Sequence, residues 1–253
     1  MSLLIATLVA AHLAVMPEPP IEPNADACFI STLCAIKESV RWRTPKWDET
    51  MCNRVGNAIL KAEKKHKLPR QLIVSVILNE SDMNEQAMRP TLKDDKVVAW
   101  DVGLMAPRCR LGKDGKCDNY KSKGLTVGQL MKPEINIEVG TSILANVRDT
   151  YACPHKNHPW WAHYNWGPKV LDTGAARGYP HRVAVLYKAM ATATNTKAPE
   201  LIGLKLPKEK GRKQRSVDEP VGKRHKELVA KVLACGGKCQ QVAIRDFTLA
   251  AGN

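Results

Sequence analysis

Acidic residues are scarce in this chain of 253 residues: 25 Asp and Glu stand against 39 Lys and Arg, for a net charge of +14. An excess of positive charge predicts a polyanionic partner, such as nucleic acid or an anionic cell envelope. The sequence lacks zinc-finger spacing, a basic region with heptads and the aromatic signature of RNA-binding domains. A nucleic-acid-binding module is therefore supported by charge alone. We expect no specific nucleic-acid partner and favour anionic cell-envelope polymers.

The N-terminal apolar run, residues 2–15, is shorter than the roughly 20 residues that a membrane-spanning helix needs. Its length suits the core of a signal peptide or anchor, through which the protein could contact a membrane, although no positive residue precedes it. A buried helix in a virion- or complex-associated protein is the alternative. Residues 16–27 contain four prolines and are expected to form an extended linker. We therefore interpret residues 1–27 as a leader and a Pro-rich linker.

The eight cysteines form an even set, which favours an oxidising compartment. Cys109 and Cys117 flank a short glycine-containing turn that could bring their sulfur atoms together, and Cys235 and Cys239 flank two glycines in the same way. The spacing does not determine the other pairings. We expect the cysteines to be largely oxidised and the protein to be periplasmic or extracellular, with association with a virion as the alternative.

The central region has no long alternation of apolar and polar residues at period two, so we expect a mainly α-helical domain over residues 28–194. Apolar residues recur at helical spacing in residues 53–67, where we expect one helix. Prolines at positions 69 and 133 mark the starts of two further expected helices, at residues 69–81 and 130–151. The acidic residues at 94, 95 and 101 are expected to lie in a loop.

The sequence changes character after residue 190. Residues 195–231 hold 11 Lys and Arg against 5 Asp and Glu, with three prolines and few large apolar side chains. Such a segment cannot bury enough apolar surface to offset its ordering entropy. We expect it to be a flexible basic linker that binds anionic envelope polymers, followed by a short C-terminal segment, residues 232–253. An amphipathic stretch at residues 228–234 could dock on the domain, lie on an envelope surface, or do neither.

Four short motifs mark a candidate site, and the first is a Glu-Ser pair that ends an apolar helical run. A carboxylate in that position is poorly solvated, so its pKa is expected to rise and it can stay protonated near neutral pH. A general acid needs this property. The motifs are Glu80-Ser81, Gly103-Leu104-Met105, Asn136-Ile137-Glu138-Val139-Gly140 and Tyr164-Asn165-Trp166-Gly167.

In this order the motifs resemble those of the soluble lytic transglycosylase family, lysozyme-like enzymes that cleave the glycan strands of peptidoglycan. The resemblance covers roughly residues 51–190 and implies a lysozyme-like helical domain. It also implies that a single Glu, as acid and then base, cleaves the MurNAc-GlcNAc β-1,4 bond to give a 1,6-anhydro product, with no cofactor and no metal ion. By this resemblance Glu80 is catalytic, and the side chain of Tyr164 points toward it. The residues expected to bind substrate or support the site are Ser81, Met105, Tyr164 and Asn165.

The sequence departs from the family pattern at two positions: Ala106 replaces a Gln, and His163 replaces an Ala. The missing amide removes one candidate sugar contact. Two other functions stay open. If Asp101 held a water molecule opposite Glu80, the protein would be a muramidase that hydrolyses the same bond. Alternatively, it binds glycan with little or no cleavage, as a structural or assembly protein of a phage particle or secretion machine.

Overall fold

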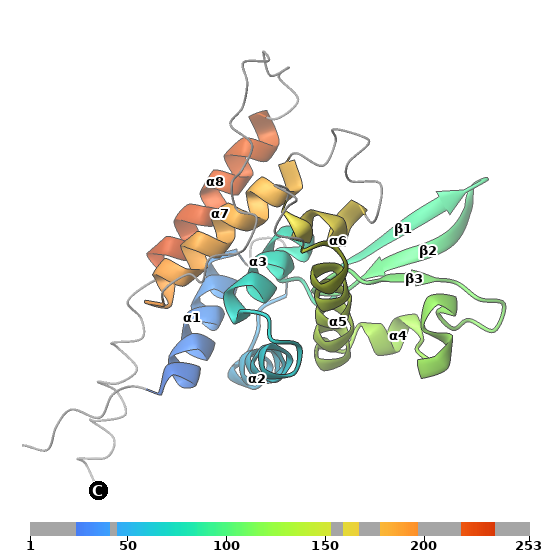
Figure 1. Cartoon of the computed structure of the whole chain (residues 1–253), viewed down its shortest axis with the longest axis horizontal. Helices are drawn as coiled ribbons and strands as arrows, with labels where there is room; N and C mark the ends of the chain where they lie inside the picture. The colour runs from blue at the N-terminus through green and yellow to red at the C-terminus, as the bar shows by residue number, and fades with distance from the viewer. Residues whose placement is uncertain (1–23, 41–44, 153–158, 167–177, 197–218, 236–253) are drawn as a thin grey trace, which may run out of the picture.

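Helices dominate the structure, a computed structural model that describes residues 24–40, 45–152, 159–166, 178–196 and 219–235 (Figure 1). The prediction of a mainly α-helical, lysozyme-like domain is confirmed. Most of the expected leader and linker lies outside the described residues, and no helix in the described part combines the length and apolarity needed to cross a membrane. The α-helices are α1 (Ala25–Val40), α2 (Glu49–His66), α3 (Arg70–Ser81), α4 (Val127–Leu130), α5 (Pro133–Tyr151), α6 (His163–Trp166), α7 (Gly178–Ala193) and α8 (Glu219–Ala234).

Helix α3 lies in the middle of the helical body and carries the apolar run that leads to Glu80 (Figure 1). Every side chain from Gln71 to Leu78 is buried, and the helix packs against α7 and α2. A helix that is apolar on all sides is stable when other elements surround it, and each large aliphatic side chain buried contributes roughly 1.5–3 kcal/mol. The packing of α3 therefore fixes the position of the residues at its C-terminal end.

The three predicted helices are present, with shifted ends. Helix α2 begins earlier than predicted because Asp48 caps it: the Asp48 carboxylate accepts a hydrogen bond of 2.7 Å from the N–H of Met51. Helix α3 follows Pro69 directly, and α5 begins at Pro133. Proline suits the first helical turn because its fixed φ is helical and its missing N–H would have had no partner there.

A three-stranded antiparallel sheet occupies residues that we expected to lie in a loop. It consists of β1 (Met88–Lys93), β2 (Lys96–Val102) and β3 (Arg108–Arg110), in that order. The loop prediction was wrong because the turn between β1 and β2 lacks the usual glycine or asparagine. Asp94 and Asp95 form this turn with φ values of 50° and 57°, which match the two-residue hairpin turn of type I′. Aspartate tolerates such φ values better than most residues do.

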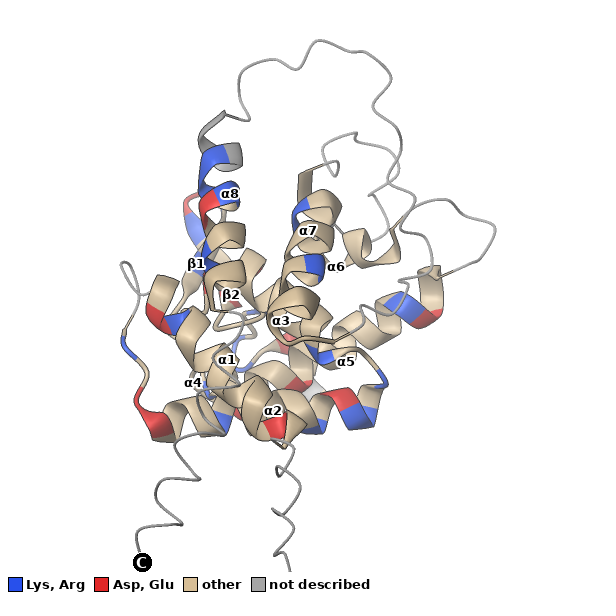
Figure 2. Ribbon diagram, turned by 90° about the vertical axis from the view of Figure 1, so that its left-hand side faces the viewer, with Lys and Arg blue, Asp and Glu red and all other residues tan. Residues whose placement is uncertain are grey.

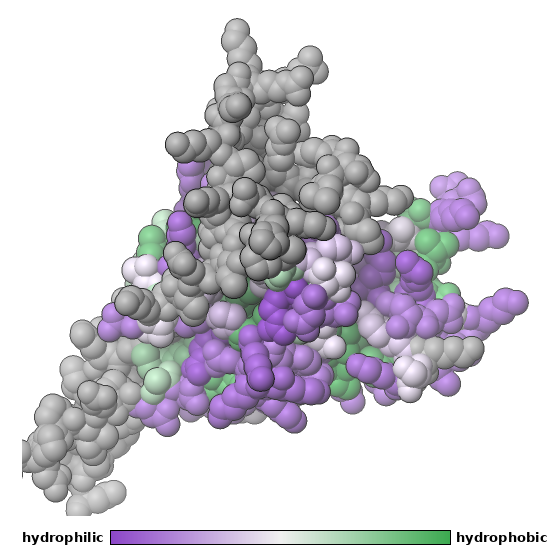
Figure 3. All heavy atoms as spheres, viewed as in Figure 1, coloured by the Kyte–Doolittle hydropathy of each residue, from purple (hydrophilic) through white to green (hydrophobic). Residues whose placement is uncertain are grey.

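One face of the sheet is apolar and packs against the helices that follow it in the chain. Trp100, Val102 and Cys109 contribute to an apolar cluster with Leu130 of α4 and Val139 of α5. The hairpin extends beyond this cluster and exposes most of the large apolar side chains on the described surface (Figure 3). These exposed residues are Met88, Leu92, Val97 and Val98.

The disulfide predicted between Cys109 and Cys117 is present, with a Cα–Cα distance of 4.9 Å, and lies in the same apolar cluster. A second disulfide joins Cys34 of α1 to Cys52 of α2, and Cys28 is disulfide-bonded as well. Cys235 is buried at the end of α8, whereas the partner expected for it, Cys239, lies outside the described residues. The observed disulfides are compatible with an oxidising compartment.

Helix α8 packs against α7 and α1 (Figure 2), although most of it falls within residues 195–231, the segment expected to be a flexible linker. Its buried residues Leu228, Val232 and Cys235 are spaced to share one face of the helix. This apolar stripe supplies the buried surface that holds α8 in place. Of the placements considered for the amphipathic stretch, the structure shows docking on the helical body. Residues 197–218 lie outside the described part.

Candidate active site

The last turn of α3 brings Glu80 to a point where α3, β1, α6 and α7 meet. Its side chain is only 5% exposed. Asn165 of α6 donates a hydrogen bond of 3.4 Å from Nδ2 to Oε1, and Arg89 of β1 places Nη2 at 3.2 Å from Oε2. The hydroxyl of Tyr179 at the start of α7 is buried and influences the same carboxylate, although it does not meet the geometry of a hydrogen bond with it. Side chains from three different elements, β1, α6 and α7, therefore surround one carboxyl group.

Burial raises the pKa of Glu80 above its ordinary value, because the carboxylate loses more hydration than the neutral acid does. The Tyr179 hydroxyl, the positive charge of Arg89 and the amide of Asn165 act in the opposite direction, since each stabilises the anion. Burial prevails, and the pKa of Glu80 stays raised. The group can thus keep its proton to higher pH than in water, and once ionised it finds polar partners in place. This combination suits an acid that later acts as a base.

The chain turns sharply directly after the acid. Asp82 and Met83 have φ values of 52° and 61°, in the left-handed region that costs a non-glycine residue roughly 1–3 kcal/mol. Tertiary contacts hold them there: Met83 is fully buried, and its carbonyl accepts a hydrogen bond of 2.8 Å from Nζ of Lys37. Ser81 donates its hydroxyl to the carbonyl of Ile77 at 3.1 Å. The Ser81 hydroxyl therefore bonds within its own helix.

The motif at residues 103–105 is fastened to α5 by Asn136, a fully buried side chain. The Asn136 Oδ1 accepts from the N–H of Met105 at 2.8 Å, and Nδ2 donates to the carbonyls of Val102 and Leu130 at 2.7 Å each. Gly103 has a φ of 70°, and a Cβ there would lie 2.3 Å from the Asn136 amide nitrogen. Two of the sequence motifs therefore support each other as scaffold, and this scaffold adjoins the site.

Tyr164 of α6 donates its hydroxyl to the carbonyl of Met105 at 2.7 Å, so its hydrogen bond goes to the motif loop and not to Glu80. Gly140 of α5 makes this approach possible, because a Cβ there would lie 2.5 Å from the Met105 Cβ and 3.0 Å from the Tyr164 hydroxyl. Met105, expected to contact the substrate, is fully buried, with its sulfur 3.5 Å from the Thr141 hydroxyl. No part of the Met105 side chain is open to a ligand, and it fills the core behind the site.

Arg89 and Tyr179 contact Glu80 without having been among the predicted site residues. Arg89 lies on a strand that the sequence patterns did not indicate, and nothing besides its charge distinguished it. Tyr179 offered a weak signal, because it follows the Tyr-Asn motif at the start of the next helix. The structure thus brings Asn165 to Glu80 and adds one cation, Arg89, and one buried hydroxyl, that of Tyr179.

Asp101, considered as a second carboxylate, lies on β2 and is engaged with Arg108. Its two oxygen atoms accept hydrogen bonds from Arg108 at 2.8 and 3.1 Å, and its side chain is 20% exposed. A carboxylate that accepts hydrogen bonds from two nitrogen atoms of one guanidinium is held in a fixed orientation.

The two departures from the family pattern have different structural settings. Ala106 has a φ of 50°, and its N–H bonds the carbonyl of Gly103 at 3.3 Å, so it closes a tight turn beside the motif. His163 is buried and stacks on Tyr151 with a centroid distance of 3.7 Å and an interplanar angle of 6°. His163 therefore serves packing between α5 and α6.

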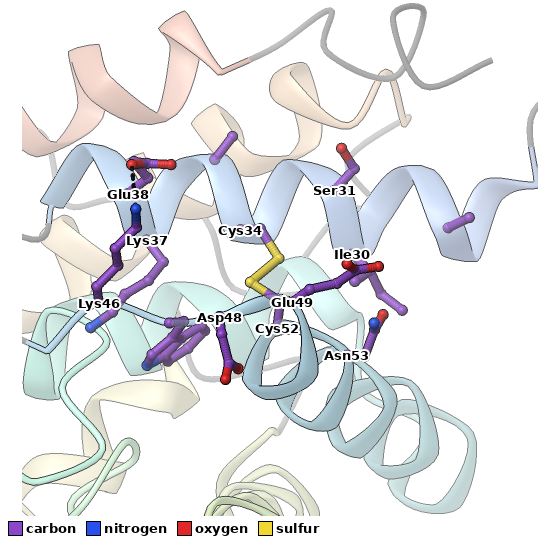
Figure 4. Close-up of a pocket in the computed structure, with 13 residues that line it drawn as sticks. Ile30, Ser31, Cys34, Lys37, Glu38, Lys46, Asp48, Glu49, Cys52 and Asn53 are labelled. Atoms are coloured by element: carbon purple, nitrogen blue, oxygen red, sulfur yellow. Dashed lines mark ion pairs between the residues drawn. A yellow bond between two sulfur atoms is a disulfide. The ribbon is translucent and has the colours of Figure 1, made fainter. Parts of the chain in front are cut away.

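A separate cavity of about 580 Å³ lies between α1 and the start of α2 (Figure 4). The Cys34–Cys52 disulfide, Trp47 and Lys37 are part of its lining, and an ion pair of 4.0 Å joins Lys46 to Glu38 at its edge. Burial lowers the pKa of Lys37 to about 8, although the charge of Glu85 opposes this shift. Neither Glu80 nor the groups that contact it line the cavity. Within the described residues, no cluster of His, Cys, Asp or Glu has the arrangement of a metal site.

Comparison with known proteins identifies the segment that carries the site. The family model described as "Transglycosylase SLT domain" matches residues 57–176, which include all four motifs and most of the groups around Glu80. No curated protein and no solved structure matches the chain. Residues 57–176 therefore form a transglycosylase SLT domain of the lysozyme-like superfamily.

Proposed function

We propose that this protein is a peptidoglycan lytic transglycosylase in which Glu80 is the single acid and base. The family of this domain supports a lytic transglycosylase-like activity on peptidoglycan. The observation that carries the finer proposal is the setting of Glu80: a carboxyl group with 5% exposure, a raised pKa and anion-stabilising partners. The bond cleaved is the β-1,4 linkage between MurNAc and GlcNAc.

In the first step Glu80 donates its proton to the glycosidic oxygen, and the C1–O bond of MurNAc breaks as the GlcNAc alcohol leaves. The carboxylate that forms is stabilised by Arg89 and Asn165, which already lie within hydrogen-bonding distance. In the second step the C6 hydroxyl of MurNAc attacks C1 and gives its proton to Glu80. A 1,6-anhydro ring forms, water is not consumed, and the acid regains its proton. Acid–base catalysis of this kind contributes roughly 10²–10⁴-fold to a rate.

Digestion of purified peptidoglycan in water enriched in heavy oxygen tests this mechanism. We expect products that end in 1,6-anhydro-MurNAc, lighter by one water than the hydrolysis products, with no heavy oxygen incorporated. Reducing ends that carry one heavy oxygen would show hydrolysis and overturn the transglycosylase proposal. Binding without any cleavage would instead favour a structural or assembly role.

Hydrolysis on the same fold is the second candidate, because Asp101 lies on the strand next to Arg89 in register with it. A water molecule activated by Asp101 would then replace the C6 hydroxyl as nucleophile. An Asp101→Asn variant separates the two reactions: a hydrolase would lose most of its activity, whereas a transglycosylase would keep its 1,6-anhydro products. The double hydrogen bond from Arg108 favours the second outcome, since it commits both Asp101 oxygens.

We further propose that the protein acts in the cell envelope and binds its anionic polymers through the basic residues near its C-terminus. Exposed Lys223, Arg224 and Lys226 of α8 belong to this set. Replacement of Lys223 and Lys226 by Gln, which leaves the buried face of α8 intact, should weaken binding to whole cell walls at low salt and much less at high salt, because exposed charges are screened beyond about 8–10 Å. Equal binding by both forms at every salt concentration would contradict this role.

A further inference from the structure

A row of charged side chains crosses the three-stranded sheet at the end that adjoins Glu80. The strand register pairs Arg89 of β1 with Asp101 of β2, and Asp101 with Arg108 of β3. Residues directly opposite each other in a sheet project from the same face, so these three side chains lie side by side. The neighbouring residues Trp100, Val102 and Cys109 project from the other face into the apolar cluster. Packing of the apolar face therefore orients the charged face of the sheet toward Glu80.

The two arginines of this row are neutralised to different degrees. Arg108 forms two hydrogen bonds with Asp101, which satisfy both carboxylate oxygens. Arg89 contacts Glu80 instead. Its Nη2 lies 3.2 Å from Oε2 of Glu80 and 3.5 Å from the backbone carbonyl oxygen of the same residue. Its side chain is 59% exposed, in contrast to the 5% of Glu80. Most of the Arg89 guanidinium therefore remains open to solvent and to a ligand.

The proposed reaction begins from the protonated form of Glu80, and in that form Arg89 has lost its anionic partner. Among the described residues, Glu80 is the acidic group with which Arg89 forms an ion pair. At the start of the reaction the site thus presents an arginine with several free N–H donors beside a neutral acid. A guanidinium in this state favours a planar carboxylate, which accepts two parallel hydrogen bonds from it.

We propose that Arg89 binds a carboxylate of the substrate next to the scissile bond and thereby makes the enzyme selective for carboxylated glycans over neutral ones. This inference rests on the proposed function, because that function places a glycan strand beside Glu80. The carboxylate could belong to a peptide stem or, in a strand without stems, to the lactyl group of muramic acid. Both sources present the same planar anion to the guanidinium.

Binding of a substrate carboxylate to Arg89 should also change proton transfer by Glu80. While Arg89 pairs with Glu80, it stabilises the carboxylate and holds the pKa below the value that burial alone would give. When Arg89 turns to a substrate carboxylate, this stabilisation weakens and Glu80 binds its proton more firmly. Both kcat and kcat/KM should fall at alkaline pH, when Glu80 loses its proton. The fall in kcat, which reports the substrate complex, should come at a higher pH than the fall in kcat/KM, which reports the free enzyme. This difference should vanish in Arg89→Gln.

The proposal is tested by ligand binding in a Glu80→Gln background, where the amide resembles the neutral acid and prevents turnover. The ligands are glycan fragments with intact stems, the same fragments with their carboxylates converted to amides, and glycan stripped of its stems. We expect Arg89→Gln to weaken binding of the carboxylated fragments about tenfold or more and to leave the amidated fragments unchanged. Arg89→Lys should restore part of the affinity, because it keeps the charge but not the fork of donors.

Lys93→Gln is the matched control, since it removes one positive charge from the same strand at the hairpin end and should leave all affinities unchanged. A loss of affinity confined to fragments with stems assigns the carboxylate to the peptide, and a loss confined to stripped glycan assigns it to the lactyl group of muramic acid. A loss for both shows that Arg89 binds either carboxylate. If Arg89→Gln lost affinity equally for carboxylated and amidated fragments, or lost no affinity, the proposal would be overturned. Because binding is measured without turnover, failure of the lytic proposal would appear separately, as the absence of cleavage by the wild-type protein.

Discussion

The helical body and the three-stranded sheet act on the same carboxyl group in opposite directions. Helix α3 belongs to the continuous core of the body and delivers Glu80 with a side chain that is 5% exposed. The sheet has its own small apolar cluster and delivers Arg89, which is 59% exposed. Burial in the body raises the pKa of Glu80 by removing water, and the sheet lowers it by supplying a positive charge, in the same direction as the polar groups of Tyr179 and Asn165. The protonation state of the acid is therefore set jointly by two regions that are built differently.

The largest effect is expected from Glu80→Gln, which removes the group on which both regions act. Cell-wall lysis, followed by turbidity, should fall by roughly 10²–10⁴-fold. Stability should not fall. Because the folded-state pKa is raised above the ordinary value of 4.5, folded Glu80 binds protons more tightly than unfolded Glu80, and its ionisation costs stability as pH rises above that value. The variant escapes this cost and should be at least as stable as wild type at neutral pH.

Glu138→Gln on α5 is the matched control for this substitution, since Glu138 pairs with Lys65 and His66 away from the site. It should lyse walls at the wild-type rate. A folded Glu80→Gln protein that is equally active would remove Glu80 from the mechanism.

The junction between the two regions depends on Asn136. Asn136→Ala removes three buried hydrogen bonds and leaves the Met105 N–H and the carbonyls of Val102 and Leu130 without their partner. We expect the free energy of unfolding in urea to fall by about 2–4 kcal/mol. The exposed Asn146 on the same helix provides the control, because Asn146→Ala should change stability by less than about 0.5 kcal/mol. Similar values for both variants would show that the junction contributes little.

A smaller effect, confined to the sheet, is expected when the Cys109–Cys117 disulfide is removed. Replacement of both cysteines by alanine should cost about 2–3 kcal/mol, since the closed loop is short. Amide exchange should quicken in β3 and in the segment before α4, and stay slow in α3. Thiol titration of the unreduced, denatured wild-type protein should find fewer than eight free thiols; all eight free would contradict both the disulfides and an oxidising location.

The smallest effect concerns Tyr179, whose hydroxyl lowers the pKa of Glu80 from within the helical body. Tyr179→Phe removes this influence, so the pKa of Glu80 should rise, and activity should persist to higher pH by up to about one pH unit. The pH profile of kcat/KM measures the shift. Tyr187→Phe, further along α7, should leave the profile in place. A shift toward lower pH in Tyr179→Phe would show that the hydroxyl stabilises the neutral acid.

Prediction from the sequence succeeded where the interactions are short-range. The apolar run before Glu80, the prolines at the starts of α3 and α5, and the short loop between Cys109 and Cys117 each act over a few residues. Prediction failed for the hairpin, because the turn at Asp94-Asp95 carries no glycine. The prediction of a flexible linker also failed for α8. The amphipathic stretch at residues 228–234 was evident from the sequence, but its docking depends on the surface that α7 and α1 provide.

By itself the sequence determined that an acidic residue ends an apolar helix and that ordered motifs follow it, because helical periodicity and helix starts depend on neighbours along the chain. Tertiary structure alone decided what surrounds that acid. Asn165 comes from 85 positions away, and Arg89 comes from a strand whose register depends on the packing of its opposite face. The same packing buries Met105 and turns the Tyr164 hydroxyl to its carbonyl. Such contacts arise from the folding of the whole chain, so no local pattern encodes them.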